Sequence, residues 1–288
     1  MRSRTTALLT LALLAGCGVA AAAAGGALPR PDHVVVVIEE NRSFANIIGN
    51  RDAPYINELA ARGALFTQSY ALAHPSQPNY LMLFAGSDLG VTNDGVPRVL
   101  PFSAPNLGAE LIASGLTFRG YSEDIPAVGF RGKKAGDYAR KHNPWVNWQG
   151  APANAIPAGC NLSFAAWPAD LERLPTVAFV VPNLQHDMHD GTIAQADAWL
   201  RAQLDPYIRW AAAHDSLFVL TFDEDDGREG QRIPTFFVGP MVRPGRYEQR
   251  ITHYEVLRTL EQMYGLAPSG AAANAAPIDF CWRPAAGR

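Results

Sequence analysis

Four groups of polar side chains in this sequence follow apolar runs, and they consist of residue types that bind metal ions and move protons. Carboxylate and amide oxygens are ligands of hard divalent cations, and histidine adds a proton carrier and a ligand for softer metals. Carboxylates gathered at one place repel one another, so a bound cation is the simplest way for them to coexist. The four groups are Glu39-Glu40-Asn41, Ser122-Glu123-Asp124, His186 to Asp190, and Asp223 to Asp226.

A serine that could act as a nucleophile lies at the predicted start of a helix. Pro75 and Pro78 flank Ser76, and the residue spacing from Asn79 onward predicts a helix. Free backbone N–H groups and the helix dipole at such a start favour an anion. A serine there can serve only as an N-cap, but a hydroxyl bound to a divalent metal ion becomes a nucleophile more easily. With Asn41 and Asn79 as donors to phosphate oxygens, these residues predict a metal-assisted esterase or phosphatase.

Apolar runs that alternate with helical patterns must position these side chains. The valine-rich run that starts at His33 predicts a strand buried on both faces. Alternating strands and helices form a parallel sheet with right-handed crossovers, and ligands bind where the carboxyl ends of the strands meet. We therefore predict a single α/β domain over residues 32–288, with a central, mostly parallel sheet and helices on both faces. Further expected strands are Ala64–Tyr70, Leu116–Tyr121, Thr176–Val181 and Ser216–Phe222, expected helices are Pro54–Arg62, Leu107–Ala113, Thr192–Arg209 and Tyr254–Tyr264, and Arg131–Trp148 is expected to be a long loop over one face.

The N-terminus has the features of a targeting segment. Arg2 and Arg4 precede the apolar stretch Thr5–Ala15, which is too short to span a bilayer comfortably, so residues 1–24 predict an export signal followed by a flexible lead over 25–31. Two processing sites are open: a lipobox that would leave a lipid anchor on Cys17, or ordinary cleavage within Ala20–Ala24. Either one predicts an exported protein that is periplasmic, secreted or an outer-membrane lipoprotein, with Cys17 as its only membrane attachment.

Composition and cysteine content narrow the function further. The 24 Lys and Arg residues against 27 Asp and Glu residues give a net charge of −3, so there is no basic field for a nucleic-acid scaffold. Outside the targeting segment the cysteines are Cys160 and Cys281. In an oxidising compartment they could form a disulfide between the C-terminus and the mid-chain loop, and two free buried thiols are the alternative.

Several short motifs resemble a known family. Ile38–Phe44 is similar to the E-N-x-S-F opening of the bacterial phosphoesterase family, which contains acid phosphatases and phosphatidylcholine-type phospholipases C. Pro54–Leu59, with Gly63, Phe66-Thr67 and Ser76–Tyr80 after it, resembles the wider alkaline-phosphatase superfamily. Asp187–Gly191 and Thr221–Glu224 are similar to later motifs of the small acid-phosphatase branch. The resemblance extends from about Asp32 to Leu266 and implies an alkaline-phosphatase-like fold.

The resemblance also implies roles for individual residues. It makes Ser76 the nucleophile that forms a phosphoserine, with His189 and His253 beside the phosphate or the leaving group. The aspartate-histidine pairs of two-zinc relatives are not evident, which favours one divalent metal ion, Ca²⁺, Mg²⁺, Mn²⁺ or Zn²⁺. Glu224 is a departure, because related enzymes can carry two aspartates at that motif. The expected metal ligands are Glu40, Asn41, Asp223 and Glu224, and the expected substrate-binding residues are Asn41, Asn79, Asp187 and Asp190.

The sequence thus predicts an exported, metal-dependent acid phosphatase that hydrolyses small phosphate monoesters. Two alternatives stay open: a phosphodiesterase or phospholipase C on the same fold, and a non-catalytic surface protein that binds a metal ion or an anion.

Overall fold

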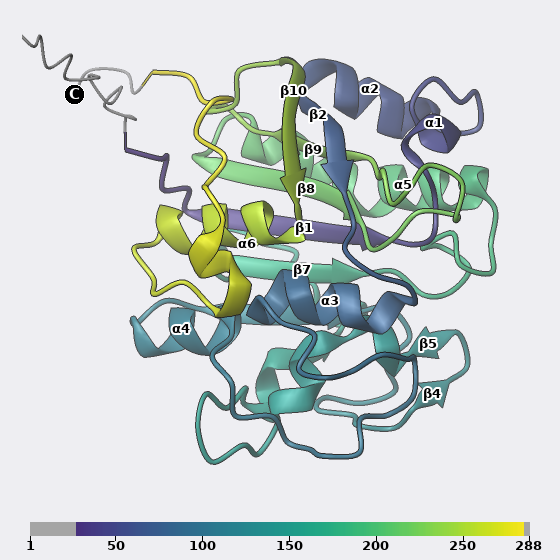
Figure 1. Ribbon diagram of the computed structural model, residues 1–288. Coiled ribbons are helices and arrows are strands. Elements are labelled where there is room, and N and C mark those ends of the chain that lie inside the picture. Colours follow the sequence, from purple (N-terminus) through teal and green to yellow (C-terminus); the bar gives the residue numbers. More distant parts are fainter. Residues whose placement is uncertain (1–26, 285–288) are drawn as a thin grey trace, which may run out of the picture.

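An eight-stranded, mostly parallel sheet forms the centre of the computed structural model, which describes residues 27–284 (Figure 1). Only β9 runs antiparallel to both of its neighbours, β2 and β8. In order across the sheet, the strands are β10 (Gly245–Thr252), β2 (Ala64–Tyr70), β9 (Thr235–Val238), β8 (Ser216–Phe222), β1 (His33–Glu39), β7 (Val177–Val181), β3 (Phe118–Ser122) and β6 (Asn161–Ser163).

Helices cover both faces of this sheet, as the sequence predicts. Figure 1 shows α3 and α6 in front of the sheet and α5 behind it. The front layer contains α3 (Ser76–Ala85), α4 (Leu107–Ala113) and α6 (His253–Met263), and the opposite layer contains α1 (Phe44–Ile47), α2 (Pro54–Arg62) and α5 (Ile193–Ala211). Among the described helices, none has both the length and the apolar character needed to cross a membrane.

The valine-rich strand β1 lies in the middle of the sheet because both of its faces are apolar. Val34, Val36 and Ile38 pack with the front helices, and Val35 and Val37 pack against the opposite layer. All five side chains are at most 1% exposed. β1 pairs in parallel with β7 on one side and with β8 on the other, and β3 pairs in parallel with β7. The carboxyl ends of β3, β7, β1 and β8 therefore lie side by side at one edge.

The long helices begin at residues that supply good caps. Thr192 accepts a hydrogen bond from Gln195 N, and Gln195 Oε1 in turn accepts one from Thr192 N, so α5 starts in a capping box. Thr252 and Glu255 form the same arrangement at the start of α6. The second box fixes His253 as the first residue of α6.

The segment expected to be a long loop is instead a packed region of short elements. It contains the hairpin β4 (Lys134–Ala135) and β5 (Tyr138–Ala139), followed by the 3₁₀ turns η1 (Arg140–His142) and η2 (Pro144–Trp148). Trp145 and Trp148 are fully buried. Asn161 Oδ1 accepts hydrogen bonds from Trp145 Nε1 and Asn143 Nδ2, which ties the turns to β6. The remaining 3₁₀ turns are η3 (Ala158–Cys160), η4 (Phe164–Ala166), η5 (Leu171–Arg173) and η6 (Gly270–Asn274).

Of the two alternatives for the cysteines, the structure has the free thiols and not the disulfide, because Cys160 and Cys281 lie beside opposite parts of the sheet. Cys160 immediately precedes the edge strand β6, where Arg119 Nη1 donates to its sulfur at 3.3 Å. Cys281 accepts a backbone bond from Arg243 and is followed by Trp282, whose ring stacks on Phe237 of β9. Both thiols are buried and free, and burial raises the pKa of each.

The predicted export signal and the lipobox at Cys17 lie outside the described residues. Residues 27–31, the end of the expected lead, form no helix or strand. They are nevertheless attached to the domain, because Tyr264 Oη donates to the carbonyl of Pro31 at 2.9 Å and Leu28 packs against the core.

Candidate active site

Backbone hydrogen bonds continue the sheet pairing past the strand ends and fix the polar clusters there. Glu40 N donates to Asp187 O at 2.7 Å, and Asp223 N donates to Glu39 O at 3.0 Å. Glu123 N similarly donates to Val181 O at 2.9 Å. The groups that follow β1, β7 and β8 therefore lie next to one another, as the parallel topology predicts.

Ser76, the first residue of α3, points at two carboxylates of this edge. Its hydroxyl donates to Glu40 Oε2 at 3.0 Å and lies 3.4 Å from Glu224 Oε1. The serine is only 1% exposed, and it stands at the positive end of the helix dipole. Glu40 and Glu224 are two of the predicted metal ligands.

The other two predicted ligands have oxygen atoms without a partner. Asn41, whose φ of +49° is in the left-handed region, donates its backbone N–H to Asp223 Oδ1 at 3.1 Å. Asn41 Oδ1 and Asp223 Oδ2 are buried and accept no hydrogen bond from any residue between 27 and 284. Burial and the nearby carboxylates of Glu40 and Glu224 raise the pKa of Asp223 well above its usual value. Burial likewise raises the pKa of Glu224 to about 7.

These oxygens fit a divalent cation. An ion held among Glu40, Asn41, Asp223 and Glu224 would give the two orphaned acceptors a partner and would offset the mutual repulsion of three buried carboxylates. An all-oxygen donor set of this kind suits Mg²⁺, Mn²⁺ or Ca²⁺.

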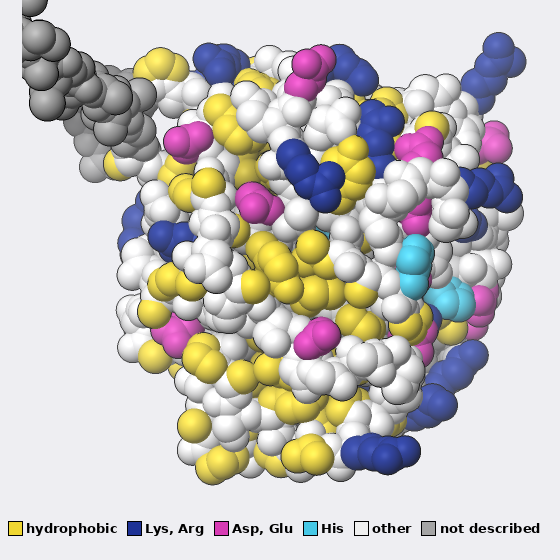
Figure 2. Space-filling model, in the orientation of Figure 1, with side chains coloured by type: hydrophobic (Ala, Val, Ile, Leu, Met, Phe, Trp, Pro, Cys, Tyr) yellow, Lys and Arg dark blue, Asp and Glu magenta, His cyan; other side chains and the backbone are white. Residues whose placement is uncertain are grey.

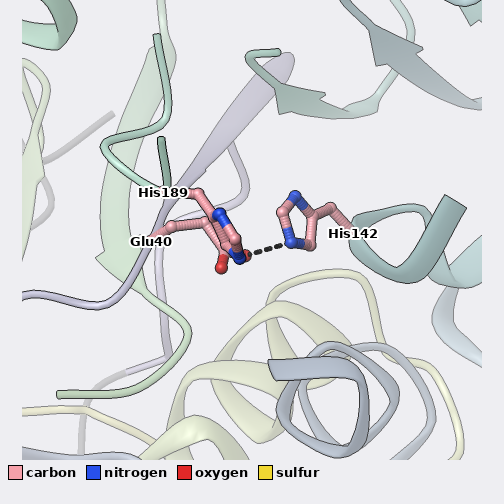
Figure 3. Close-up of side chains that lie close together, drawn as sticks. All are labelled: Glu40, His142 and His189. Carbon is pink, nitrogen blue, oxygen red and sulfur yellow. Dashed lines mark ion pairs between the residues drawn. The ribbon is translucent and has the colours of Figure 1, made fainter. Parts of the chain in front are cut away.

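A second group that could hold a metal ion shares Glu40 with the first. Glu40, His142 and His189 each offer one ligand atom, and these atoms lie within 4.8 Å of one another. Figure 3 shows the three side chains converging from different segments, with the ion pair between His142 Nε2 and Glu40 Oε1 at 3.0 Å. The two oxygens of Glu40 thus face different partners, Oε2 toward Ser76 and Oε1 toward His142.

His142 is a site residue whose role the sequence left undecided, within the Arg140–Asn143 cluster of the expected loop. Its Nδ1 lies 3.1 Å from Asp187 Oδ2, its Nε2 faces Glu40, and its ring stacks on Tyr80. Burial alone would lower the pKa of His142, but the Glu40 and Asp187 carboxylates outweigh burial and raise the pKa to about 10. With both ring nitrogens facing carboxylates, His142 acts as a buried cation. Because it lies in a turn, outside any strand end or motif, no pattern decided between a site residue and an ordinary loop histidine.

His189 faces the site together with a lysine. Its Nδ1 bonds to Asp190 Oδ1 at 2.7 Å, and its Nε2 lies 3.0 Å from Lys141 Nζ, which also contacts Asp94 Oδ2 at 3.0 Å. Asp187 Oδ1 accepts the backbone N–H of His189 at 2.8 Å. Asp187 and Asp190, predicted to bind substrate, therefore hold His142 and His189 in place.

His253 and Asn79 have supporting positions. His253 Nε2 donates to the carbonyl of Asp223 at 2.8 Å, its Nδ1 has no partner, and burial lowers the pKa of the ring to about 4. Asn79 Oδ1 accepts from Leu72 N and Ala73 N, and its Nδ2 donates to Ala73 O. Asn79 thus orders the loop before α3, and its contact with phosphoryl oxygens stays a prediction, since Nδ2 carries a second N–H beside the one that bonds to Ala73 O.

His74, which the sequence left undecided, is a further neighbour of the metal-ligand set. Its ring bridges Glu224 Oε2 at 2.8 Å and Asp225 Oδ1 at 3.1 Å. His186 pairs instead with Glu123 at 2.9 Å, behind the site. The Ser122-Glu123-Asp124 cluster supports the loop after β7, since Glu123 Oε2 also accepts from Asn183 N.

Comparisons with known proteins identify phosphatases among the relatives of this chain. A phosphatidylinositol-3-phosphatase of Mycobacterium tuberculosis is 52% identical over 261 residues, covering 90% of this chain and 85% of its own. A phosphate-repressible acid phosphatase of Penicillium chrysogenum is 31% identical over 228 residues, covering 75% of this chain and 55% of its own. This chain therefore spans about half the length of that fungal relative.

Solved structures show the same fold at low sequence identity. An alkaline-phosphatase-superfamily protein from Vibrio parahaemolyticus matches with a TM-score of 0.58 and 13% identity, over 86% of this chain and 71% of its own. Phosphonate monoester hydrolase of Agrobacterium radiobacter matches with a TM-score of 0.53 and 15% identity, over 86% of this chain and 78% of its own. The predicted fold class and family resemblance are thereby confirmed. The model of the phosphoesterase family matches residues 49–267, and the chain belongs to that family of hydrolases acting on phosphoric esters.

Proposed function

We propose that this protein is an exported, metal-dependent acid phosphatase that hydrolyses phosphate monoesters through a phosphoserine on Ser76. The observation that carries the proposal is the position of the Ser76 hydroxyl, 3.0 Å from Glu40 Oε2 and 3.4 Å from Glu224 Oε1, beside the unpartnered oxygens of Asn41 and Asp223. Geometry favours the all-oxygen metal set over the histidine-containing one, because both nitrogens of His142 already face carboxylates. A metal ion there would lower the pKa of the Ser76 hydroxyl.

Each residue of the site then has a separate role in the proposed reaction. Ser76 Oγ attacks phosphorus and gives its proton to Glu40 or Glu224, the two carboxylates that the hydroxyl faces, while the bond from phosphorus to the leaving oxygen breaks. The start of α3 stabilises the charge on the transferred group. The hydrogen-bonded pair of Lys141 Nζ and His189 Nε2 is placed to supply the proton that the leaving oxygen takes up. Water then attacks the phosphoserine, which releases inorganic phosphate and restores the hydroxyl. His142 and His253 hold Glu40 and Asp223 and do not transfer protons.

The substrate class is suggested by the relatives. The acid-phosphatase names of the fungal proteins and the name of the Mycobacterium tuberculosis protein favour small phosphorylated molecules or the head group of a phosphorylated inositol lipid. A phosphodiesterase on the same fold is the rival activity. Comparing turnover of an aryl phosphate with that of a choline phospholipid separates the two.

Replacing the nucleophile tests the mechanism and the non-catalytic alternative together. Ser76→Ala should lower hydrolysis of p-nitrophenyl phosphate on the order of 10³-fold, because no other group takes the phosphoryl group. Acid-quenched wild type should carry one phosphoryl group on the peptide that contains Ser76. The matched control is Ser69→Ala, a buried serine of β2 that bonds to Thr235 outside the site. If Ser76→Ala keeps its activity, or if wild type has none across pH, the proposed mechanism is wrong.

Export rests on the N-terminal sequence alone. Mass spectrometry of the mature protein should find either a lipid-modified Cys17 or a new N-terminus within Ala20–Ala24. A mature chain that begins at Met1 inside the cell would contradict export.

A further inference from the structure

A cavity beside Ser76 collects basic side chains that the proposed reaction uses only in part. The cavity has a volume of about 290 Å³, and its wall includes Gln77, the neighbour of the nucleophile, and His189. The sequence contains only three lysines, Lys133, Lys134 and Lys141. All three lie on this wall, together with Arg140. In Figure 2 the dark-blue Lys and Arg side chains gather at the lower right, where Figure 1 shows the β4–β5 hairpin.

Arg140 is a buried cation without a counter-charge. It is 2% exposed, and among the described residues its only side-chain hydrogen bond runs from Nη2 to Asn147 Oδ1 at 2.8 Å. Within residues 27–284 its Nε and Nη1 have no hydrogen-bond partner, and no ion pair involves it. Leaving a guanidinium buried and unpaired is costly, and an anion in the cavity would offset that cost. Burial without a carboxylate nearby lowers the pKa of Arg140.

The acids on the same wall do not cancel this positive charge. Asp94 bonds to Lys141 Nζ and to the backbone N–H of Gln77, and Asp190 bonds to His189. Both carboxylates are thus already paired with other residues of the cavity wall. Lys133 and Lys134 are exposed, so the cavity wall combines one buried positive charge, Arg140, with two exposed ones.

We propose that this cavity binds a second anionic group of the substrate, a phosphate monoester or diester that is not hydrolysed. The inference rests on the proposed phosphatase function and adds a substrate class to it: phosphomonoesters that carry another phosphate on a small carbon scaffold. The cavity and the nucleophile share a wall, because a ring nitrogen of His189 lies within 4.8 Å of a Glu40 carboxylate oxygen. Val96 and Leu184 supply apolar surface for the scaffold between the two charges.

The test compares substrates that differ by one phosphate. Wild type should show a higher kcat/KM for fructose 1,6-bisphosphate than for fructose 6-phosphate, by roughly tenfold, which corresponds to one well-placed charge contact. The double variant Lys133→Gln/Lys134→Gln should remove most of that preference through KM. Its turnover of p-nitrophenyl phosphate should stay unchanged, because neither exposed lysine contacts Ser76 or its partners. Arg140→Lys should lower the preference less than Arg140→Met.

A matched control removes two positive charges elsewhere. Arg246→Gln/Arg250→Gln changes the exposed edge strand β10, outside the cavity wall, and should leave the preference intact. A monophosphorylated inositol lipid in phosphatidylcholine vesicles is the second probe, since it also presents a monoester and a second phosphate. The subsite is supported if wild type prefers the soluble bisphosphate, the lipid or both, and the lysine double variant loses that preference. The preferred probe then shows whether the second phosphate comes from a soluble molecule or from a lipid.

The inference and the function on which it rests fail differently. Equal bisphosphate preference in wild type and the lysine double variant, or no preference with either probe, overturns the subsite while phosphatase activity stands. Absence of hydrolysis of every monoester, including p-nitrophenyl phosphate, overturns the function. Binding to Ser76→Ala gives a readout without turnover, because the bisphosphate should raise its Tm more than fructose 6-phosphate does, and equal shifts would speak against the subsite.

Discussion

At the scale of single residues, His142 connects the two halves of the site. It lies between Glu40, which contacts the nucleophile, and Asp187, which fixes the backbone of His189. If the positive charge of His142 is removed, the buried carboxylates of Glu40 and Asp187 are left without a counter-charge in a low-dielectric interior. The same residue therefore governs both stability and the position of Glu40.

We expect His142→Asn to lower the free energy of unfolding on the order of 3 kcal/mol, because two buried carboxylates lose their counter-charge. Phosphatase activity should fall roughly 10- to 100-fold, as for other residues that orient a metal ligand. Urea denaturation and initial rates measure the two effects. His214→Asn, at an exposed histidine, is the control and should change neither. Wild-type stability in His142→Asn would show that the ring is not the charge that holds Glu40.

A second residue-scale prediction concerns pH. Glu261 in α6 is fully buried, and burial raises its pKa to about 7 from an ordinary 4.5. The folded state therefore holds a proton that the unfolded state releases, so the contribution is fully present below pH 4.5 and is lost as pH rises toward 7. Between these two pH values the free energy of unfolding falls by roughly 3 kcal/mol.

Glu261→Gln should remove this slope, because the amide keeps an acceptor for Ser269 N, which donates to Glu261 Oε1 at 2.7 Å. Tm measured from pH 4 to pH 8 should decline more steeply in wild type than in the variant. Glu58→Gln, on an exposed part of α2, should follow wild type. Parallel curves for wild type and Glu261→Gln would mean that the carboxyl is ionised in the fold at no cost.

Residues that follow strands were predictable, and residues in turns were not. Glu40, Asn41, Asp223 and Glu224 could be found because a buried strand ends just before them, and a parallel sheet brings such ends together. His142 comes from a turn whose position depends on buried tryptophans far from any motif. The hydrogen-bond partners of a side chain are equally invisible in sequence, so the bonds of Asn79 to the loop before α3 were not expected.

At the scale of elements, helix boundaries depend on local chemistry that the sequence displays. The capping box at Thr192 opens the 19-residue helix α5, which packs Ala196, Trp199 and Leu200 against the sheet. Such a box satisfies backbone donors that would otherwise lack partners at the helix start. The predicted start of this helix agrees with the structure for that reason.

Thr192→Ala should lower the free energy of unfolding by about 1 kcal/mol, the usual contribution of an N-cap. For a domain of this size the Tm should fall by roughly 2–4 °C. Thr192→Ser keeps a hydroxyl acceptor for Gln195 N and should restore most of the loss. Calorimetry measures the Tm of wild type and of both variants. An unchanged Tm in the alanine variant would show that the Thr192 cap does not stabilise the fold.

The two edge strands of the main sheet escaped prediction because they lie at its edges, and the short β9, β4 and β5 escaped it too. β10 reads GRYEQRIT, and all six residues before Ile251 are exposed or intermediate. Without a buried face on each side, such a strand shows no apolar run or strict alternation. β6 is only three residues long. The long interior strands show a run of apolar residues in the sequence. The edge strands lack such a run and can be recognised only from the strand with which they pair.

At the scale of the whole molecule, a bound metal ion would join distant parts of the chain. Its proposed ligands lie after β1 and after β8, and both strands belong to one sheet. A ligand that binds only the folded state stabilises it by an amount set by concentration and affinity, about 2.7 kcal/mol at one hundred times Kd.

Removing metal with a chelator should therefore lower the Tm by roughly 5–10 °C, with recovery on adding back the divalent cation. Asp223→Asn should abolish this metal-dependent shift, since it removes one of the charged oxygens. The measurement needs no substrate and so separates metal binding from turnover. A Tm indifferent to chelator and cation in wild type would argue against a resident ion.

The central position of β1 has a consequence for how the chain is made. This valine-rich strand is synthesised first, yet its neighbours are Val177–Val181 and Ser216–Phe222, so more than half of the sequence must emerge before either side can pair. Until then this apolar strand stays unpaired and exposed in the nascent polypeptide. Contacts between residues so far apart in sequence also form slowly. A chain truncated before residue 177 should aggregate through this segment, and we expect holdase chaperones to raise the yield of the full-length protein during its biosynthesis.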